Sequence, residues 1–151
     1  MSVQEKIKEI APEPSAYVAG SAKRPIVLLV EDDKALRRYL ELTLVNAGYE
    51  VILAADGLEG MKMALTSNAD IIVTDAMMPH LSGHEFCRFL KNSPNLSQLP
   101  IVMLSGSEPQ HATTDNDLVD VFLSKPLSAD QLTSCLEELL SRRNNELFRR
   151  P

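Results

Sequence analysis

The 151-residue sequence contains no apolar run that approaches the ~20 residues needed for a membrane-spanning helix. Its beginning, from Met1 to Ile10, is polar and charged and lacks the apolar stretch of a secretory signal peptide. Only two cysteines occur, Cys87 and Cys135, and they lie outside any metal-ligand spacing. These absences predict a cytoplasmic protein with reduced thiols, and they argue against a membrane span or a disulfide framework.

The body of the sequence also lacks a basic excess. The formal charge is -6, from 15 basic and 21 acidic residues. Residues 1–24 carry four basic and three acidic side chains, and residues 142–151 carry four arginines and one glutamate, which leaves ten net negative charges on residues 25–141. An acidic body argues against direct nucleic-acid binding. The final arginines are interpreted as a solvated helix end, with contact to an acidic partner as the alternative: Arg142, Arg143, Arg149 and Arg150.

The chain is expected to form one domain with an extension at each end. Residues 1–24 carry no sustained apolar periodicity, so we expect a flexible arm, with at most a short helix over Gln4–Ile10, that tethers the protein or covers a surface. Residues 25–141 have the size of one domain, and 142–151 form a basic tail. Because only this tail follows Leu140, we expect a stand-alone domain or a piece of a longer protein.

From Pro25 onward, short apolar runs alternate with amphipathic segments. The apolar runs are continuous and rich in β-branched residues, which is typical of strands buried on both faces. They predict strands at 26–30, 50–54, 71–74, 100–104 and 121–123. The amphipathic segments predict helices over 33–47, 56–66 and 82–91, and a last helix that opens at Ser128 and buries Leu132, Leu136, Leu139 and Leu140.

Capping residues mark where these helices begin. Three pairs have capping-box spacing: Asp56 with Glu59, Ser82 with Glu85, and Ser128 with Gln131. Gly48 is expected to end the first helix. Strands that alternate with helices predict an α/β fold with a parallel sheet covered on both faces. Right-handed crossovers make the flavodoxin-like, doubly wound order 2-1-3-4-5 the leading topology.

Polar side chains follow four of the expected strands. Acids follow the first and third strands, and a hydroxyl and an ammonium follow the fourth and fifth: Glu31-Asp32-Asp33, Asp75, Ser105 and Lys125. Because ligands bind at the carboxyl ends of such strands, we expect these groups to converge. Clustered carboxylates repel one another unless a cation intervenes, and oxygen ligands favour Mg²⁺ or Mn²⁺. A carboxylate can also attack phosphorus, and phosphoryl transfer needs mainly positioning and charge neutralisation.

The order and spacing of these residues resemble response-regulator receiver domains of two-component signalling. The resemblance covers about residues 25–141, and the ordered set is specific although each motif alone is weak. The matching segments are Leu28-Leu29-Val30-Glu31-Asp32-Asp33, Ile71-Ile72-Val73-Thr74-Asp75-Ala76-Met77-Met78-Pro79 with Gly83, Val102-Met103-Leu104-Ser105-Gly106, and Lys125-Pro126.

The resemblance implies a role for each acid and for the residue beside the acceptor. Asp75 would be the phospho-acceptor. Asp32 would bind Mg²⁺ directly, and Glu31 would reach the ion directly or through water, whereas Asp33 would cap the following helix. Met77 would offer its backbone carbonyl to the metal.

The resemblance also implies roles at the ends of the fourth and fifth strands. Ser105 would hydrogen-bond a phosphoryl oxygen, and Lys125 would pair with the phosphoryl group or with Asp75. The Lys125–Pro126 peptide bond is often cis in this family. Phe122 matches the switch aromatic, which moves inward when Ser105 shifts.

The function implied is a phosphorylation-dependent switch. It would accept a phosphoryl group from a histidine kinase or phosphotransfer protein and signal through protein contacts. No enzymatic activity is expected beyond its own phosphorylation and dephosphorylation, and no contact with nucleic acid or membrane. One alternative is a receiver-like scaffold that works without phosphorylation. Another is a phosphatase of the haloacid dehalogenase type, which would need Asp-x-Asp after the first strand, where Glu31-Asp32-Asp33 stands.

Two features depart from the family pattern. The stretch 106–121 is about two residues shorter and is polar around Pro109. We therefore expect the helix before the fifth strand to be short, frayed or absent, and the family's usual dimer and partner contacts to be altered. Met77 also places an apolar side chain beside the expected phosphoryl group. Our hypothesis is that Met77 hinders water and prolongs the phosphorylated state.

Overall fold

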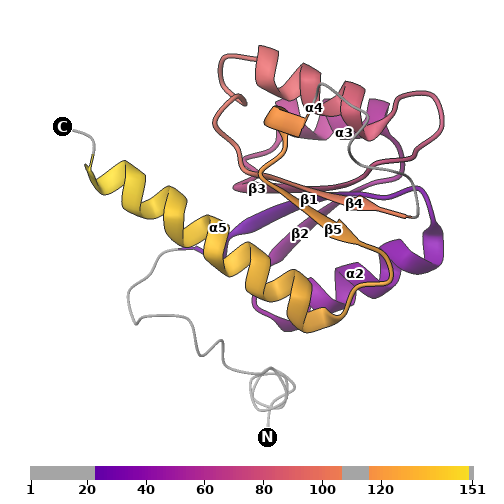
Figure 1. Ribbon diagram of the computed structural model, residues 1–151, viewed down its shortest axis with the longest axis horizontal. Coiled ribbons are helices and arrows are strands. Elements are labelled where there is room, and N and C mark those ends of the chain that lie inside the picture. The colour runs from indigo at the N-terminus through magenta and orange to yellow at the C-terminus, as the bar shows by residue number, and fades with distance from the viewer. Residues whose placement is uncertain (1–22, 107–115, 150–151) are drawn as a thin grey trace, which may run out of the picture.

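The computed structural model describes residues 23–106 and 116–149. Its five parallel strands form one sheet in the order β2-β1-β3-β4-β5 (Figure 1), which confirms the flavodoxin-like topology. The strands are β1 (Ile26–Val30), β2 (Glu50–Ala54), β3 (Ile71–Asp75), β4 (Ile101–Ser105) and β5 (Val121–Ser124). Each begins and ends within about one residue of the range expected from its apolar run.

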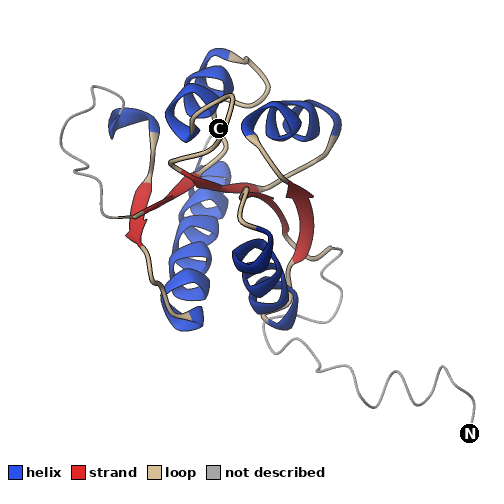
Figure 2. Ribbon diagram, turned by 90° about the vertical axis from the view of Figure 1, so that its right-hand side faces the viewer, coloured by secondary structure: helices blue, strands red, loops and turns tan. Residues whose placement is uncertain are grey.

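In the described part of the chain, helices cover both faces of the sheet (Figure 2). Cores form on both faces because consecutive strand residues point in opposite directions. In β1, Leu28 packs in one core and Leu29 in the other, and both are fully buried. One face carries α2 (Lys34–Asn46) and α5 (Ala129–Arg149), and the other carries α3 (Gly57–Thr66) and α4 (Gly83–Asn92).

Side-chain caps fix the beginnings of the helices as expected. The Glu59 N–H donates to Asp56 Oδ1 at 2.8 Å, and the Glu85 N–H donates to Ser82 Oγ at 3.1 Å. At α5 the bonds are reciprocal, because the Gln131 N–H donates to Ser128 Oγ and the Ser128 N–H donates to Gln131 Oε1. Beyond α2, Gly48 takes a positive φ of 98°, a conformation that glycine adopts without strain.

The last helix, α5, continues through most of the basic segment 142–151. The expected basic tail is helical through Arg149, and the yellow end of α5 extends past the sheet (Figure 1). Arg143 Nη1 donates to the Asp70 carbonyl at 2.7 Å, and Asp70 Oδ2 accepts the Ile26 N–H at 2.8 Å. Arg142 pairs with Glu138 one turn back on an exposed surface. Arg142, Arg143 and Arg149 therefore belong to the last turns of α5.

Two expectations fall mainly on residues that the structure does not describe. The arm, with its proposed helix over Gln4–Ile10, lies almost wholly in residues 1–22, and most of the atypical stretch before β5 lies in 107–115. The described part of that stretch contains a short 3₁₀ turn, Asn116–Leu118. No disulfide joins Cys87 and Cys135, the two cysteines of the described residues. Within the described residues, no helix is both long and apolar enough to cross a membrane.

Candidate phosphorylation and metal site

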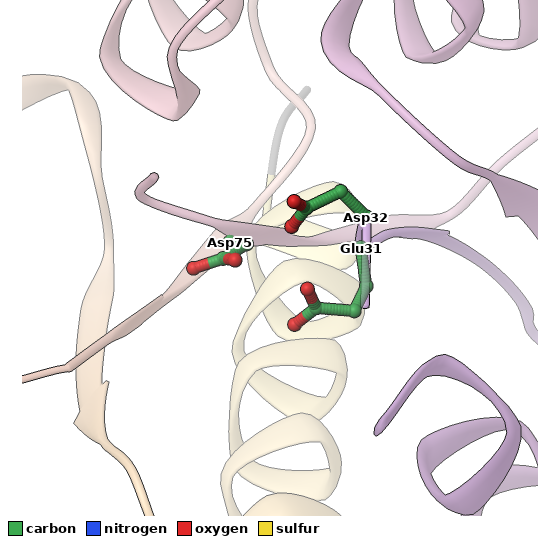
Figure 3. A group of neighbouring side chains, drawn as sticks. All are labelled: Glu31, Asp32 and Asp75. Carbon is green, nitrogen blue, oxygen red and sulfur yellow. The ribbon is translucent and has the colours of Figure 1, made fainter. Parts of the chain in front are cut away.

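Three carboxylates meet at the carboxyl edge of the sheet. Glu31 and Asp32 directly follow β1, and Asp75 ends β3, which pairs with β1. Figure 3 shows the three side chains directed toward a common space. One oxygen from each lies within 4.8 Å of an oxygen from each of the others. The acids that the sequence predicts to converge therefore do so, although Asp75 lies far along the chain from Glu31 and Asp32.

Glu31 and Asp32 are neighbours in sequence but differ in exposure. Glu31 is 0% exposed, whereas Asp32 is exposed. Glu31 Oε2 accepts the Asp33 N–H at 3.1 Å, and Arg37 Nη1 donates to the Glu31 carbonyl at 2.9 Å. Burial, reinforced by Asp75 and only partly offset by the Asp33 N–H and by Lys125, raises the pKa of Glu31 to about 7. Glu31 is thus poised to exchange a proton near neutral pH.

Lys125 closes the other side of the cluster. Its Nζ lies 3.1 Å from Asp75 Oδ1 and 3.2 Å from Glu31 Oε1. The Lys125–Pro126 bond is cis, and the Lys125 N–H donates to the Ser105 carbonyl at 2.7 Å. Burial would lower the pKa of Lys125, but its contacts with Asp75 and Glu31 outweigh burial, so the pKa is raised. Lys125 therefore remains a cation beside Asp75.

The charges of the cluster fit a divalent cation. With all groups ionised, three carboxylates face one ammonium, which leaves two negative charges uncompensated. Clustered carboxylates of this kind repel one another and take up protons unless a cation neutralises them. Because the donors are all oxygen atoms, the set suits Mg²⁺ or Mn²⁺ better than a thiophilic metal.

Residues on both sides of Asp75, in β3 and in the loop after it, hold Asp75 in place. The Met77 N–H donates to Asp75 Oδ1 at 3.3 Å, and Thr74 Oγ1 donates to the Asp75 carbonyl at 3.1 Å. The Met77 side chain is 62% exposed, and Asp75 is 5% exposed. Asp75 is therefore fixed in position, with an apolar side chain standing next to it at the surface.

Gly83 allows α4 to begin against this loop. The Gly83 N–H donates to the Ala76 carbonyl at 3.0 Å. A Cβ atom at this position would lie 2.2 Å from the Asp75 carbonyl oxygen and 2.9 Å from Ala76 Cα. Both atoms belong to the backbone and cannot move aside easily, so the loop geometry requires glycine.

The remaining predicted residues lie close to the cluster or on the same sheet. Asp33 caps α2, as expected, by accepting the Leu36 N–H at 2.9 Å. Ser105 is 3% exposed at the end of β4, directly after Leu104, the residue aligned with Asp75. Phe122 in β5 packs against the core on the α3 and α4 face. The switch roles of Ser105 and Phe122 stay predictions.

Sequence reasoning missed three contributions to the site. Arg37 anchors the backbone of Glu31, and Thr74 anchors that of Asp75. Gly83 belongs to the motif that follows Asp75, but the motif does not show how closely Gly83 approaches the Asp75 backbone. No sequence signal singles out Arg37 as such an anchor, because Lys34 and Arg38 stand near it with the same charge.

The sheet has the strand order β2-β1-β3-β4-β5, acids stand at the ends of its first and third strands, and a lysine follows its fifth strand. Together these features define a class of signalling domain. The chain belongs to the response regulator receiver domain family, whose model matches residues 27–137. Members of this family are signalling modules rather than enzymes in the ordinary sense.

Similar proteins support the same family. The chain is 39% identical over 106 residues to the transcriptional regulatory protein AfsQ1 of Streptomyces coelicolor, covering 70% of this chain and 42% of that protein. It is 31% identical over 113 residues to protein PilG of Pseudomonas aeruginosa, covering 74% of this chain and 84% of PilG. The chemotaxis response regulator CheY4 of Vibrio cholerae aligns with a TM-score of 0.71 and 30% identity, over 77% of this chain and 98% of CheY4.

Proposed function

We propose that this protein is a cytoplasmic, phosphorylation-controlled switch with Asp75 as its phosphoryl acceptor. The observation that supports this most strongly is the placement of Lys125 Nζ 3.1 Å from Asp75 Oδ1, in a cluster that also contains the two acids after β1. The donor would be a sensor histidine kinase or a phosphotransfer protein, and the output would be contact with a downstream protein.

The same residues would hold the divalent cation. Glu31, Asp32 and Asp75 supply carboxylate oxygens, and Met77 would add its backbone carbonyl. When bound, Mg²⁺ or Mn²⁺ neutralises negative charge on the phosphoryl oxygens. Release of the Glu31 proton would accompany binding of the cation, because a ligating carboxylate must be ionised.

The transfer needs one nucleophile and well-placed charges. A carboxylate oxygen of Asp75 attacks the phosphorus of a phosphohistidine, an O–P bond forms, and the N–P bond breaks. The electron pair of the broken bond stays on the imidazole nitrogen of the donor, which then takes up a proton. Lys125 would stabilise the negative phosphoryl oxygens, and the buried Ser105 hydroxyl would bond one of them.

The negative charge of the phosphoryl group on Asp75 would then change the relative populations of two conformations of the protein. Ser105 and Phe122 lie on adjacent strands, so a movement of Ser105 toward the phosphoryl group would open space for the half-buried Phe122 ring. Such a shift favours one of two pre-existing arrangements rather than a new fold.

Intact mass measurement tests this proposal. After incubation with acetyl phosphate and Mg²⁺, we expect the mass of one added phosphoryl group, and we expect Asp75→Asn to abolish it. Asp33→Asn is the matched control, because Asp33 caps α2 and asparagine caps helices equally well. An equal mass increase in Asp75→Asn would refute Asp75 as the acceptor.

A phosphoryl analogue separates the switch from a scaffold that works without phosphorylation. Beryllium fluoride with Mg²⁺ should bind the parent protein and shift resonances of residues near Asp75 in NMR spectra. A scaffold with a non-working site would show no such shift.

A further inference from the structure

The turn between β1 and α2 carries two of the three carboxylates of the site. Glu31 and Asp32 leave the end of β1 side by side, and both point toward Asp75 (Figure 3). Glu31 Oε2 accepts the Asp33 N–H at 3.1 Å, and Glu31 Oε1 lies 3.2 Å from Lys125 Nζ. Among the described residues, no hydrogen bond holds the Asp32 carboxylate in this way. The position of the Asp32 side chain therefore depends on the backbone of the turn.

Arg37 holds that backbone from α2. Its N–H donates to the carbonyl of Asp33, the N-cap residue, at 2.8 Å, so Arg37 lies one turn into the helix. Because side chains of a helix lean toward its N-terminus, the guanidinium reaches back to the turn, where Nη1 donates to the Glu31 carbonyl at 2.9 Å. Within residues 23–106 and 116–149, Arg37 forms no ion pair, and its side chain is directed to this backbone oxygen.

This hydrogen bond controls the direction of Asp32. The Glu31 carbonyl and the Asp32 N–H belong to one planar peptide group, so holding the carbonyl oxygen also fixes the plane from which Asp32 departs. Glu31 is 0% exposed, and without the Arg37 donor its carbonyl would lose its partner and favour rotation of the peptide group toward another donor. Such a rotation would move the Asp32 carboxylate away from its place beside Glu31 and Asp75.

We propose that Arg37 is a positioning residue for the divalent cation, which holds the peptide group between Glu31 and Asp32 in the orientation at which Asp32 binds the ion. This role rests on the proposed function, because it concerns the same cation site. Residues that orient metal ligands in this way typically raise the affinity for the metal by about 10- to 100-fold.

The positive charge of Arg37 acts in the opposite direction. A guanidinium beside the site repels a divalent cation, so removal of its charge alone would tighten cation binding. A positioning role instead predicts weaker binding when Arg37 is replaced. A merely structural role would lower the free energy of unfolding without changing the cation affinity of the folded protein. The sign of the change in affinity therefore separates the three roles.

Titration with Mn²⁺ measures this affinity directly, because the electron paramagnetic resonance signal of the free ion falls as the ion binds. In the full chain, we expect Arg37→Met to raise the Kd for Mn²⁺ by roughly 10- to 100-fold. Arg37→Lys keeps a positive charge and a donor for the Glu31 carbonyl, and it should recover most of the affinity. Arg38→Met is the matched control: it removes the same charge from a side chain that is 66% exposed and pairs with Glu41, and it should not weaken binding.

The three variants also define the results that contradict the proposal. A Kd of Arg37→Met equal to or below that of the parent would overturn it. An Arg37→Lys variant that binds as weakly as Arg37→Met would overturn it too, and so would an equal loss in Arg38→Met. Absence of Mn²⁺ binding by the parent would instead refute the cation site of the proposed function. Circular dichroism confirms that each variant is folded, and Arg37→Ala is a second variant without a donor, with the same expected loss.

Discussion

The Lys125 ammonium lies 3.1 Å from Asp75 Oδ1, although fifty residues and two strands separate them in the chain. The pairing depends on the parallel order of β3, β4 and β5, which brings their carboxyl ends to one edge. It joins the proposed acceptor to the cation that would stabilise the incoming phosphoryl group.

Replacing Lys125 by methionine should slow phosphorylation of Asp75. A hydrogen bond to a charged group contributes about 1.5–3 kcal/mol, so we expect a roughly 10- to 100-fold lower rate with acetyl phosphate. Intact mass followed over time measures the rate. Lys62→Met, on the exposed surface of α3, is the control and should keep the parent rate. An unchanged rate in Lys125→Met would exclude a role for the ammonium in transfer.

The stability of the metal-free protein should depend on the protonation of Glu31. The folded protein keeps the Glu31 proton up to a pKa of about 7, whereas the unfolded chain releases it near the ordinary value of 4.5. The folded state thus binds more protons between these values, and the free energy of unfolding should fall as pH rises through this window. Urea unfolding at a series of pH values without metal measures this.

Glu31→Gln and added Mg²⁺ test the origin of that pH dependence. The glutamine variant has no carboxyl group to titrate, so its free energy of unfolding should vary less between pH 4.5 and 7. Saturating Mg²⁺ should stabilise the parent more at pH 8 than at pH 5, because only the ionised carboxylate binds the cation. The same slope in Glu31→Gln and parent would assign the pH dependence to another group.

The lifetime of the phosphorylated state should depend on Met77. Its amide holds Asp75 Oδ1, and its apolar side chain is 62% exposed beside the acceptor. We expect Met77→Asn to lose the phosphoryl group faster, because a shorter polar side chain admits and orients water. Loss of added mass after removal of acetyl phosphate gives the lifetime. Leu58→Asn, a change of an exposed apolar residue on α3, is the comparison, and equal lifetimes in Met77→Asn and parent would refute the hypothesis.

Gly83→Ala should destabilise the protein and disturb the acceptor. The added methyl group would stand 2.2 Å from the Asp75 carbonyl oxygen, so the loop or the start of α4 must shift. Overpacking of this kind lowers the free energy of unfolding by about 1–3 kcal/mol. Gly60→Ala is the matched control, because its methyl group would meet side-chain atoms of Val30 and Phe86 at 3.1 Å or more. Urea unfolding should show the larger loss for Gly83→Ala.

Local patterns made most of the fold predictable. Apolar runs defined the strands, and pairs such as Ser82 with Glu85 defined where helices begin, because both signals act within a few residues. The convergence of Asp32, Asp75 and Lys125 was also predictable, since it follows from a parallel sheet once the strands are known. The location of the site therefore follows from the order and direction of the strands.

Features that depend on contacts between distant residues were not predictable. The arginines after residue 141 are expected at a solvated helix end, and no local pattern indicates that Arg143 meets Asp70 across 73 positions. The sequence also does not predict that Glu31 is buried while Asp32 is exposed. This difference depends on how the chain turns from the end of β1 into α2.

The length of α5 has a mechanical consequence. The helix begins three residues after the cis Pro126 and, at ~1.5 Å per residue, spans about 30 Å to Arg149. A tilt of only ~5° at its first turn would displace its far end by ~2–3 Å at this rise per residue. A small rearrangement around the lysine loop is thus geometrically amplified at the far end of α5, beyond the contact between Arg143 and Asp70.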